Sequence, residues 1–265
     1  MSKVNALAIY GIEENSPRQI YELGLIFFKV LGLKITAACY YKYREDRSEE
    51  DLDLVDISLS DLKLAIDAGS ATSFRLYHES SDGVLWDAGF GYSTEDFGGF
   101  YHIDAQGLSS CLNQEKFLEF ASEFLKWGSM DYAIFYPADN VADAFDYAAG
   151  ENFVSVYSCE NPKLFRKETR LFEGLERYKK ETLRMVYSAN VINGAHLEQR
   201  VGGCSLQAWI LSDASHGSLG QETSGLWFWI VNDQDLEKVN SELGAQGLLI
   251  SWRASSSSNR LRKIP

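Results

Sequence analysis

Three consecutive patterns make up residues 6–43, ALAIYGIEENSPRQIYELGLIFFKVLGLKITAACYYKY. The first is a short apolar run typical of a strand. In the second, Ser16 can cap a helix, Pro17 suits its first turn and Gly32 can end it, while the apolar residues between them recur on one helical face. The third, residues 34–43, is rich in residue types that favour strands. The stretch therefore predicts a strand–helix–strand unit.

The rest of the chain continues this mixture of helices and strands. Two-residue alternation predicts a strand at residues 51–57, and glycine-containing turns divide residues 70–104 into a meander of three strands. Further helices are predicted at residues 61–69, 113–128, 141–150, 161–189 and 233–247, and further strands at 130–139, 153–160, 224–233 and 248–252. The last of these form a second strand–helix–strand unit. The sequence predicts an α+β fold, with a mostly antiparallel sheet or sheets packed against helices.

Length and composition suit a folded core. The chain has 265 residues, of which 45% are hydrophobic and only four are proline. We expect one α+β domain over residues 1–254, with a division into subdomains 1–108 and 109–254 left open. Residues 255–265 are polar and basic, as is typical of a mobile tail.

The formal net charge of −13 is concentrated in the middle of the chain. Residues 45–104 contain fifteen acidic and three basic residues, a net charge of −12. Residues 1–44 carry +3, residues 105–152 carry −6 and residues 153–265 carry +2. The acidity is therefore a regional feature and not a uniform adjustment for solubility.

The most acidic stretch, RSEEDLDLVDISLSD at residues 47–61, also contains a regular set of apolar residues. It has six carboxylates and one arginine, with Leu52, Leu54 and Val55 among the apolar members. A disordered acidic tail would lack such a set. We expect the leucines to dock this segment on the core while the carboxylates face water, which gives a folded acidic surface.

Several classes of protein are disfavoured. The four cysteines are widely spaced and form no CxxC pair, which favours a reduced protein without a zinc site. The first residues lack the features of a signal peptide, and no apolar run reaches the roughly 18–20 residues that span a membrane. Nucleotide-binding and common hydrolase motifs are absent. We expect a cytoplasmic protein that is not an enzyme, with no cofactor, no metal and no membrane partner.

Three weaker possibilities concern chemistry. His78 and His102 are predicted in neighbouring strands and could share a metal ion. Cys204 could be a reactive thiol with His196 or His216 as its base. Two carboxylates of the acidic region could serve a glycoside hydrolase or a magnesium site. Structural roles for the histidines and the thiol, and a solvated face for the carboxylates, are the favoured interpretations.

Aromatic residues lie between the acidic ones in residues 79–104, which contain no lysine or arginine. Some of these aromatic side chains should face the core and others should remain outside, framed by carboxylates. Such anchors suit the capture of a basic protein surface, through anchor burial and electrostatic steering. The same charge disfavours nucleic acid as a direct partner.

This combination resembles the immunity proteins of bacterial polymorphic-toxin and type VI secretion systems. The resemblance rests on the early amphipathic helix QIYELGLIFF, the strand region VLWDAGFGYSTEDFGGF and the aromatic block from SLQAWILSD to SGLWFWIVND. The most similar type is paired with nuclease toxins of the restriction-endonuclease fold. The resemblance implies direct binding and neutralisation of a cognate secreted toxin, whose own cleft for a phosphate backbone is expected to be basic.

The expected toxin-binding residues come from the acidic region and its aromatic neighbours. They are Glu49, Glu50, Asp51, Asp53, Asp56, Asp82, Trp86, Asp87, Tyr92, Glu95, Asp96 and Phe97. Two alternatives stay open. One is a carboxylate-dependent hydrolase of unrecognised family, and the other is an adaptor or chaperone that binds an effector without inhibiting it.

Overall fold

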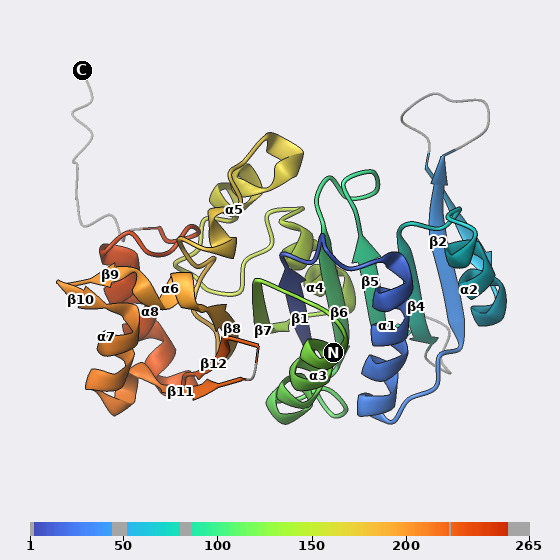
Figure 1. The fold of residues 1–265 in the computed structure, drawn as a ribbon. Helices are drawn as coiled ribbons and strands as arrows, with labels where there is room; N and C mark the ends of the chain where they lie inside the picture. The colour runs from blue at the N-terminus through green and yellow to red at the C-terminus, as the bar shows by residue number, and fades with distance from the viewer. Residues whose placement is uncertain (1–2, 44–51, 80–85, 223, 254–265) are drawn as a thin grey trace, which may run out of the picture.

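A computed structural model describes residues 3–43, 52–79, 86–222 and 224–253, and ten of its strands form one sheet (Figure 1). The order of strands in the sheet is β11-β12-β8-β7-β1-β6-β5-β4-β2-β3, and every neighbouring pair is antiparallel. The ten strands are β1 (Val4–Tyr10), β2 (Ala37–Tyr43), β3 (Leu52–Ile57), β4 (Phe74–Glu79), β5 (Trp86–Ser93), β6 (His102–Leu108), β7 (Tyr132–Ala138), β8 (Ala189–Asn193), β11 (Ser218–Gln221) and β12 (Leu226–Ile230). A separate small hairpin pairs β9 (Arg200–Val201) with β10 (Cys204–Ser205).

The described helices alternate with these strands along the chain. The α-helices are α1 (Pro17–Leu31), α2 (Leu59–Asp67), α3 (Gln114–Trp127), α4 (Val141–Ala149), α5 (Pro162–Glu168), α6 (Gly194–Glu198), α7 (Leu206–Ser212) and α8 (Leu236–Ala245). Short 3₁₀ turns are η1 (Arg170–Phe172), η2 (Arg177–Lys179), η3 (Ala214–His216) and η4 (Asp233–Asp235). The predicted α+β class with a largely antiparallel sheet is confirmed. None of the described helices is long and apolar enough to cross a membrane.

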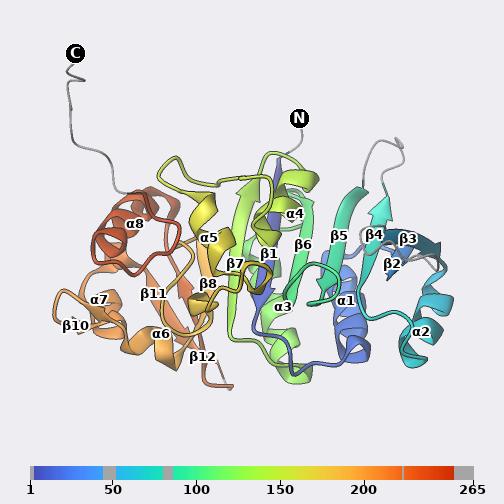
Figure 2. The same ribbon diagram turned by 90° about the horizontal axis from the view of Figure 1, so that it is seen from above.

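The sheet has one hydrophobic core on each face, and strand β1 contributes to both. Its Leu7 and Ile9 pack with α1, α2 and α3, whereas its Ala8 and Tyr10 pack with α4 and α5. This division follows from the two-residue alternation of side chains along a strand. We call the two sides the α1 face and the α4 face; Figure 2 shows them as the lower and upper sides of the sheet.

Helix α1 forms as its local sequence predicts. The Ser16 side chain accepts a hydrogen bond from the Gln19 backbone N–H and the Gln19 side chain accepts one from the Ser16 backbone N–H, which makes a capping box. Pro17 occupies the first turn, and Gly32 ends the helix in the left-handed conformation at φ 72°. Such a φ is one that glycine adopts without cost. The flanking strands β1 and β2 complete the predicted strand–helix–strand unit.

The predicted meander is also confirmed. Strands β4, β5 and β6 pair antiparallel in succession, and β1 closes against β6. Helix α3 follows with Phe117, Phe120 and Phe124 buried, whereas Trp127 is 64% exposed and does not join the core. The predicted helix at residues 61–69 begins earlier, because Ser58 caps α2.

The predicted long helix at residues 161–189 is wrong. Only α5 and two 3₁₀ turns form there, and the chain then runs without regular structure into β8. Glu173 and Glu176 have positive φ values of 57° and 50°, which an α-helix excludes. Gly174 between them packs so closely on the Glu168 backbone that a side chain would overlap it. A tight local turn, in which Gly174 and Glu176 donate to the Thr169 and Glu168 carbonyls, therefore replaces the helix.

Two predicted strands are also wrong. Residues 153–160 form no strand; Phe153 has φ 55°, and Glu160 makes an isolated bridge with Trp252. Residues 248–252 likewise make only isolated bridges, the other joining Leu183 to Leu249. Both segments lie over the α4 face, where Leu248, Leu249 and Ile250 are buried against helix α8 and its neighbours. Burial accounts for their apolar composition without strand pairing.

Candidate functional site

Part of the α4 face carries no helix among the described residues. Helices α1 and α2 cover strands β2, β3 and β4 on the α1 face, whereas α4 on the other side contacts β6 and β5 (Figure 2). Ala38 and Tyr40 of β2 pack into the α1-face core, so the alternate residues Tyr41 and Tyr43 belong to the α4 face. The outer three strands thus present side chains that no helix covers.

The side chains on this uncovered area are mainly apolar. Strand β3 pairs with β2 so that Leu54 lies opposite Tyr41 and Leu52 opposite Tyr43. The exposed fractions are 42% for Tyr43, 45% for Leu52 and 52% for Leu54. We call this area the open aromatic face and define it by Tyr41, Tyr43, Leu52, Leu54, Asp56, Tyr77, Trp86 and Phe97.

The loop between β5 and β6 forms one border of the open aromatic face. The Phe97 ring lies 4.8 Å from the Tyr43 ring and 6.2 Å from the Tyr41 ring, measured between centroids. The Tyr43 hydroxyl donates a hydrogen bond of 2.8 Å to the Asp96 carbonyl. Because Asp96 and its neighbour Glu95 are exposed, carboxylates stand directly beside the aromatic cluster.

A buried polar network supports the open aromatic face from beneath. Arg75 of β4 donates to both carboxylate oxygens of Asp104 on β6, at 3.1 and 2.5 Å. Gln106, with its amide turned to satisfy its neighbours, donates to Asp104 at 3.2 Å and accepts from the Trp86 indole at 3.0 Å. The Trp86 ring in turn lies 4.7 Å from the Tyr77 ring. Trp86 is therefore held in place by a hydrogen bond to the sheet itself.

Two glycines on the intervening strand β5 make room for this network. Gly91 lies opposite both Arg75 and Asp104, and any side chain there would overlap the ion pair. A Cβ atom on Gly89 would lie 2.7 Å from the end of the Gln106 amide that faces the Trp86 indole. The GFG run in the acidic region thus admits a buried ion pair across three strands.

The protonation states of the network are stable around neutral pH. Burial alone would lower the pKa of Arg75, but the Asp104 carboxylate outweighs it and the net pKa is raised. Burial raises the pKa of the Tyr77 and Tyr41 phenols, while the Arg75 charge opposes the shift. The cation is matched by Asp104 and the phenols stay neutral, so the network adds no net charge to the surface.

The apolar residues of β3 point opposite to the prediction. Leu52 and Leu54 were expected to dock on the core, yet both are exposed on the α4 face. Ile57 and Leu59 pack against the α1-face core instead, and Leu62 of α2 is buried there. Alternation correctly indicated a strand, but the buried side is the one that Asp53 shares with Val55 and Ile57.

The expected toxin-binding residues fall into three groups. Asp56, Trp86 and Phe97 belong to the open aromatic face, and Glu95 and Asp96 border it. Asp53 lies on the opposite side of β3, and Asp87 is half-buried at the start of β5. Tyr92 is only 1% exposed within the α1-face core, which removes its ring from any partner. Glu49, Glu50, Asp51 and Asp82 lie outside the described residues.

The sequence patterns did not point to three members of the face, Tyr41, Tyr43 and Tyr77, or to the outward orientation of Leu52 and Leu54. A signal was present in ACYYKY, where alternate tyrosines flank Lys42 at the end of a strand. Such alternation identifies one face of a strand but does not indicate whether a helix covers it.

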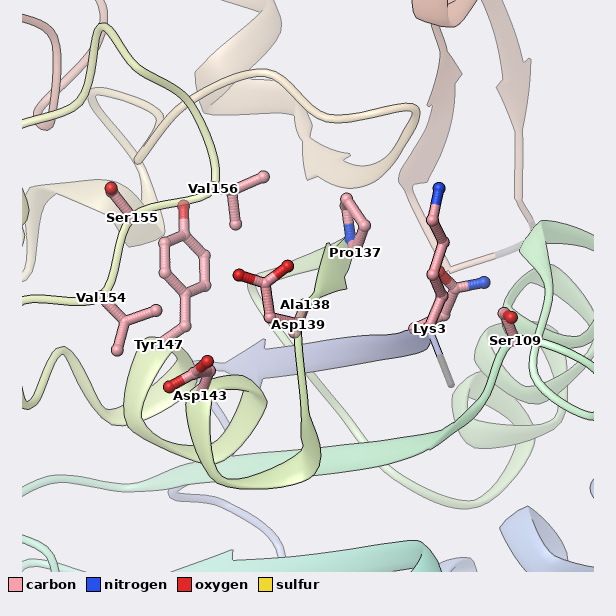
Figure 3. Close-up of a pocket in the computed structure, with 11 residues that line it drawn as sticks. Lys3, Ser109, Pro137, Ala138, Asp139, Asp143, Tyr147, Val154, Ser155 and Val156 are labelled. Carbon is pink, nitrogen blue, oxygen red and sulfur yellow. The ribbon is translucent and has the colours of Figure 1, made fainter. Parts of the chain in front are cut away.

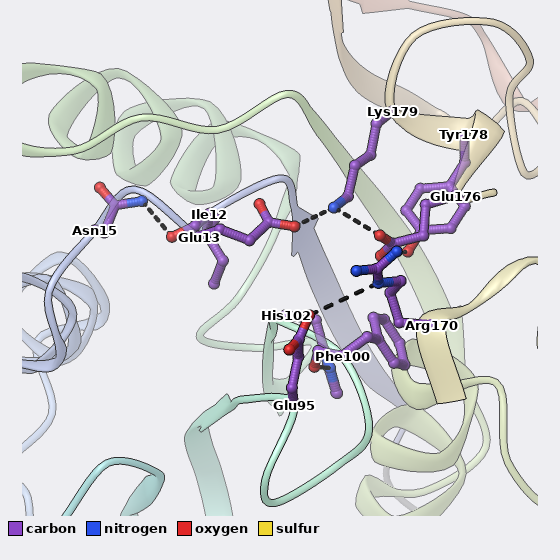
Figure 4. Close-up of polar contacts among 10 residues, drawn as sticks. All are labelled: Ile12, Glu13, Asn15, Glu95, Phe100, His102, Arg170, Glu176, Tyr178 and Lys179. Carbon is purple, nitrogen blue, oxygen red and sulfur yellow. Dashed lines mark hydrogen bonds and ion pairs between the residues drawn. The ribbon is translucent and has the colours of Figure 1, made fainter. Parts of the chain in front are cut away.

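A second contact joins the β5–β6 loop to the irregular segment after α5 (Figure 4). Arg170 lies 3.7 Å from the Glu95 carboxylate, and Leu171 packs against Gly99. Nearby, the Lys179 ammonium contacts the carboxylates of Glu13 and Glu176. These contacts link the loop that carries Phe97 to the helix-covered part of the α4 face.

The prediction that His78 and His102 lie in neighbouring strands is wrong, because β5 lies between β4, which carries His78, and β6, which carries His102. His78 bonds the Lys34 carbonyl at 2.7 Å, and His102 is buried with its ring 4.4 Å from Phe100. Within the described ranges, no group of three or more His, Cys, Asp or Glu side chains is placed to hold a metal ion.

The thiol of Cys204 and its two suggested bases are bound to other groups. Cys204 donates to the Val201 carbonyl at 3.2 Å. His196 contacts the Asn193 backbone through Nδ1 and the Tyr178 carbonyl through Nε2. His216 contacts the Trp209 carbonyl and stacks on that indole at 3.7 Å. Structural roles account for all three side chains.

A cavity of about 300 Å³ lies beside the start of α4 (Figure 3). Its lining includes Asp139, Asp143, Tyr147 and Lys3. Asp143 accepts a hydrogen bond from the Asn140 side chain at 2.7 Å, so it belongs to the cap of α4. These two carboxylates lie outside the acidic meander that the hydrolase alternative invoked.

Comparison with known proteins gives one informative likeness. No protein-family model matches the chain, and a search of curated proteins finds no match. Among solved structures, the chain is similar to one described as Pseudomonas aeruginosa T6SS protein PA0821. The TM-score is 0.55 at 12% identity, over 100% of this chain and 78% of that one. At this identity the likeness establishes a shared fold.

Proposed function

We propose that this chain is an immunity protein that binds a cognate secreted antibacterial toxin and neutralises it stoichiometrically. The open aromatic face carries the proposal, since it combines exposed anchors, a rigid floor and bordering carboxylates. The description of the structural neighbour as a T6SS protein supports the same setting. In this proposal the chain acts in the cytoplasm by binding alone, with no catalytic step and no cofactor.

The chemistry of the face favours a basic protein partner. Exposed Leu52, Leu54 and Tyr43 can enter a partner's pockets, as apolar and aromatic anchors do at protein interfaces. Asp56 and Asp96 stand among these anchors, while the nearby Arg75 cation is already matched by Asp104. A nuclease toxin fits this requirement, because a cleft that holds phosphates is basic.

The test is co-expression with the protein encoded by the adjacent gene, scored by host survival and co-purification. The variant Tyr43→Ser/Leu52→Ser/Leu54→Ser should weaken binding about 100-fold or more, as loss of central anchors does. Leu64→Ser/Leu211→Ser is a matched control, because those leucines are 65% and 67% exposed on helices α2 and α7. Equal binding by both variants would exclude the open aromatic face.

The same assay separates the alternatives. Binding without host rescue would identify an adaptor or chaperone. A harmless neighbouring protein that forms no complex would contradict the immunity proposal.

The contribution of the carboxylates is tested by measuring the association rate at several salt concentrations. Asp56→Ser/Asp96→Ser should lower the association rate at low ionic strength and flatten its salt dependence. Glu119→Ser/Glu123→Ser on α3 removes the same charge from the α1 face and should leave the association rate and its salt dependence unchanged.

A further inference from the structure

Strand β3 is one edge of the ten-stranded sheet, and half of its backbone groups point away from the sheet. The orientation follows from β2, whose Tyr41 donates its N–H to Ser73 on the β4 side at 3.1 Å. The alternate residues Tyr40 and Lys42 therefore bond β3, through their partners Val55 and Asp53. The N–H and C=O groups of Leu54 and Asp56 consequently point outward.

Apart from its two aspartates, this edge lacks the usual protection against strand pairing. Natural edge strands are often kept short, interrupted by proline or bulges, or marked with lysine. Strand β3 has six residues, LDLVDI, with neither proline nor lysine, and its register with β2 is continuous. The opposite edge, β11, has four residues and contains Gly220. Of the two edges, β3 is the better template for an added strand.

The side chains of β3 restrict what can pair with it. Leu52, Leu54 and Asp56 project on the open aromatic face, and Asp53 projects on the other side. An antiparallel second copy of β3 that sets Asp56 opposite its counterpart would be destabilised by the like charges. A strand with apolar residues opposite the leucines and lysine or arginine opposite the aspartates has complementary charge.

We propose that β3 accepts an extended, basic segment of the toxin as an eleventh strand of the sheet. This inference rests on the proposed function and specifies how the partner docks. Backbone hydrogen bonds to Leu54 and Asp56 fix the register of the added strand, and its alternate side chains extend the open aromatic face. The apolar anchors and the sheet edge then act as one continuous binding surface.

The experiment uses proline at outward-facing edge positions. Leu54→Pro removes an outward N–H without removing a bond to β2, whereas Leu54→Ala keeps that N–H and shortens the side chain. Gln221→Pro is the matched control on β11, since the neighbouring Glu222 bonds Leu226 and so directs the Gln221 N–H outward. Each variant is titrated with the protein encoded by the adjacent gene, after its fold is verified by circular dichroism.

We expect Leu54→Pro to bind at least tenfold more weakly than Leu54→Ala, and Gln221→Pro to bind as wild type does. In the wild-type complex, amide exchange at Leu54 and Asp56 should slow while exchange at Gln221 stays unchanged. This second measurement decides the matter even where Leu54→Pro does not fold.

Three results would overturn the inference. In the first, the wild-type chain binds the neighbouring protein, both proline variants bind it with equal affinity, and the β3 amides are not protected in the complex. This result rejects strand addition but leaves the proposed function intact. A wild-type chain that fails to bind the neighbouring protein rejects both. A dimer of this chain that dissociates in Leu54→Pro identifies a second copy as the occupant in place of a toxin.

Discussion

Two arginines are buried on the α4 face, one beside its open part and one beneath its covered part, and they are neutralised differently. Arg75 forms an ion pair with Asp104, and the Phe145 ring lies 4.5 Å from its guanidinium. Arg184 lies between the rings of Tyr147 and Phe165, at 3.5 and 3.8 Å from their centroids. No described carboxylate lies within ion-pair distance of Arg184, which donates instead to the Tyr10 hydroxyl and the Tyr147 carbonyl.

The difference concerns how each region stays rigid. Beneath the covered part, helices and irregular segments supply rings and carbonyl groups that enclose the cation. On the open part, fewer rings and carbonyl groups surround the cation. The Asp104 carboxylate on β6, two strands away from Arg75 on β4, neutralises it instead. The open aromatic face can therefore remain uncovered and still hold its side chains in fixed positions.

The largest effect on the free energy of unfolding is expected from removing Arg75, the cation beside the open aromatic face. Arg75→Met leaves the Asp104 carboxylate buried and unpaired, which should lower the free energy of unfolding by about 3–5 kcal/mol. Arg184→Met deprives the Tyr10 hydroxyl and the Tyr147 carbonyl of a donor but breaks no direct ion pair, so it should cost less, about 1–3 kcal/mol. Urea unfolding at pH 7 measures both. The double variant Arg75→Met/Asp104→Leu should recover part of the loss, and an Arg184→Met cost above that of Arg75→Met would contradict the comparison.

A change of similar size in the free energy of unfolding, dependent on pH, is expected from His196, which is buried beneath the covered part of the α4 face. Burial lowers the pKa of His196 to about 4, although its contacts with backbone carbonyls favour the charged form. Since the unfolded chain takes up this proton near pH 6.5, stability should fall as the pH drops from 6.5 to 4, by about 3 kcal/mol. Urea unfolding across that range should show a smaller slope for His196→Gln. A slope unchanged by this substitution would assign the dependence to other groups, among them His102, whose pKa burial also lowers.

The smallest change in the free energy of unfolding is expected from an exposed leucine of the open aromatic face, and a buried leucine provides the contrast. Leu54→Ser should change the free energy of unfolding by no more than about 0.5 kcal/mol, because the side chain is half exposed and borders no cavity. Leu76→Ala on the neighbouring strand should cost about 2–5 kcal/mol, since Leu76 is fully buried. Thermal unfolding of the two variants gives the comparison. A large loss for Leu54→Ser would show that this leucine has a structural role and so weaken its assignment to binding.

Local signals in the sequence predicted those elements whose causes are local. Helix α1 has its cap, its proline and its terminal glycine within the segment itself, and the β4–β6 meander has turn residues between its strands. The segment after α5 has a helical pattern too, but Glu173 and Glu176 adopt positive φ, and Gly174 and Glu176 fold back to donate to the Thr169 and Glu168 carbonyls. Apolar periodicity within residues 161–189 does not reveal this turn.

The candidate site was predictable in composition but not in geometry. Acidic and aromatic residues pointed to the region that contains the open aromatic face, and Phe97 and Asp56 are among its members. Alternation in β3 could not indicate which side is buried, since Leu54 and Val55 are equally apolar. The Arg75–Asp104 pair depends on strand order and on Gly91 between them, neither of which the sequence reveals alone.

The central position of β1 has a consequence for the order of folding during synthesis. Strand β1 is made before every other strand, yet its partners are β6, which begins at His102, and β7, which begins at Tyr132. At the ribosome, β1 must therefore wait unpaired while β2–β5 assemble by shorter-range contacts. Folding of the sheet's centre is a long-range, late step, which favours slow folding and exposes an apolar strand to chaperones in the meantime.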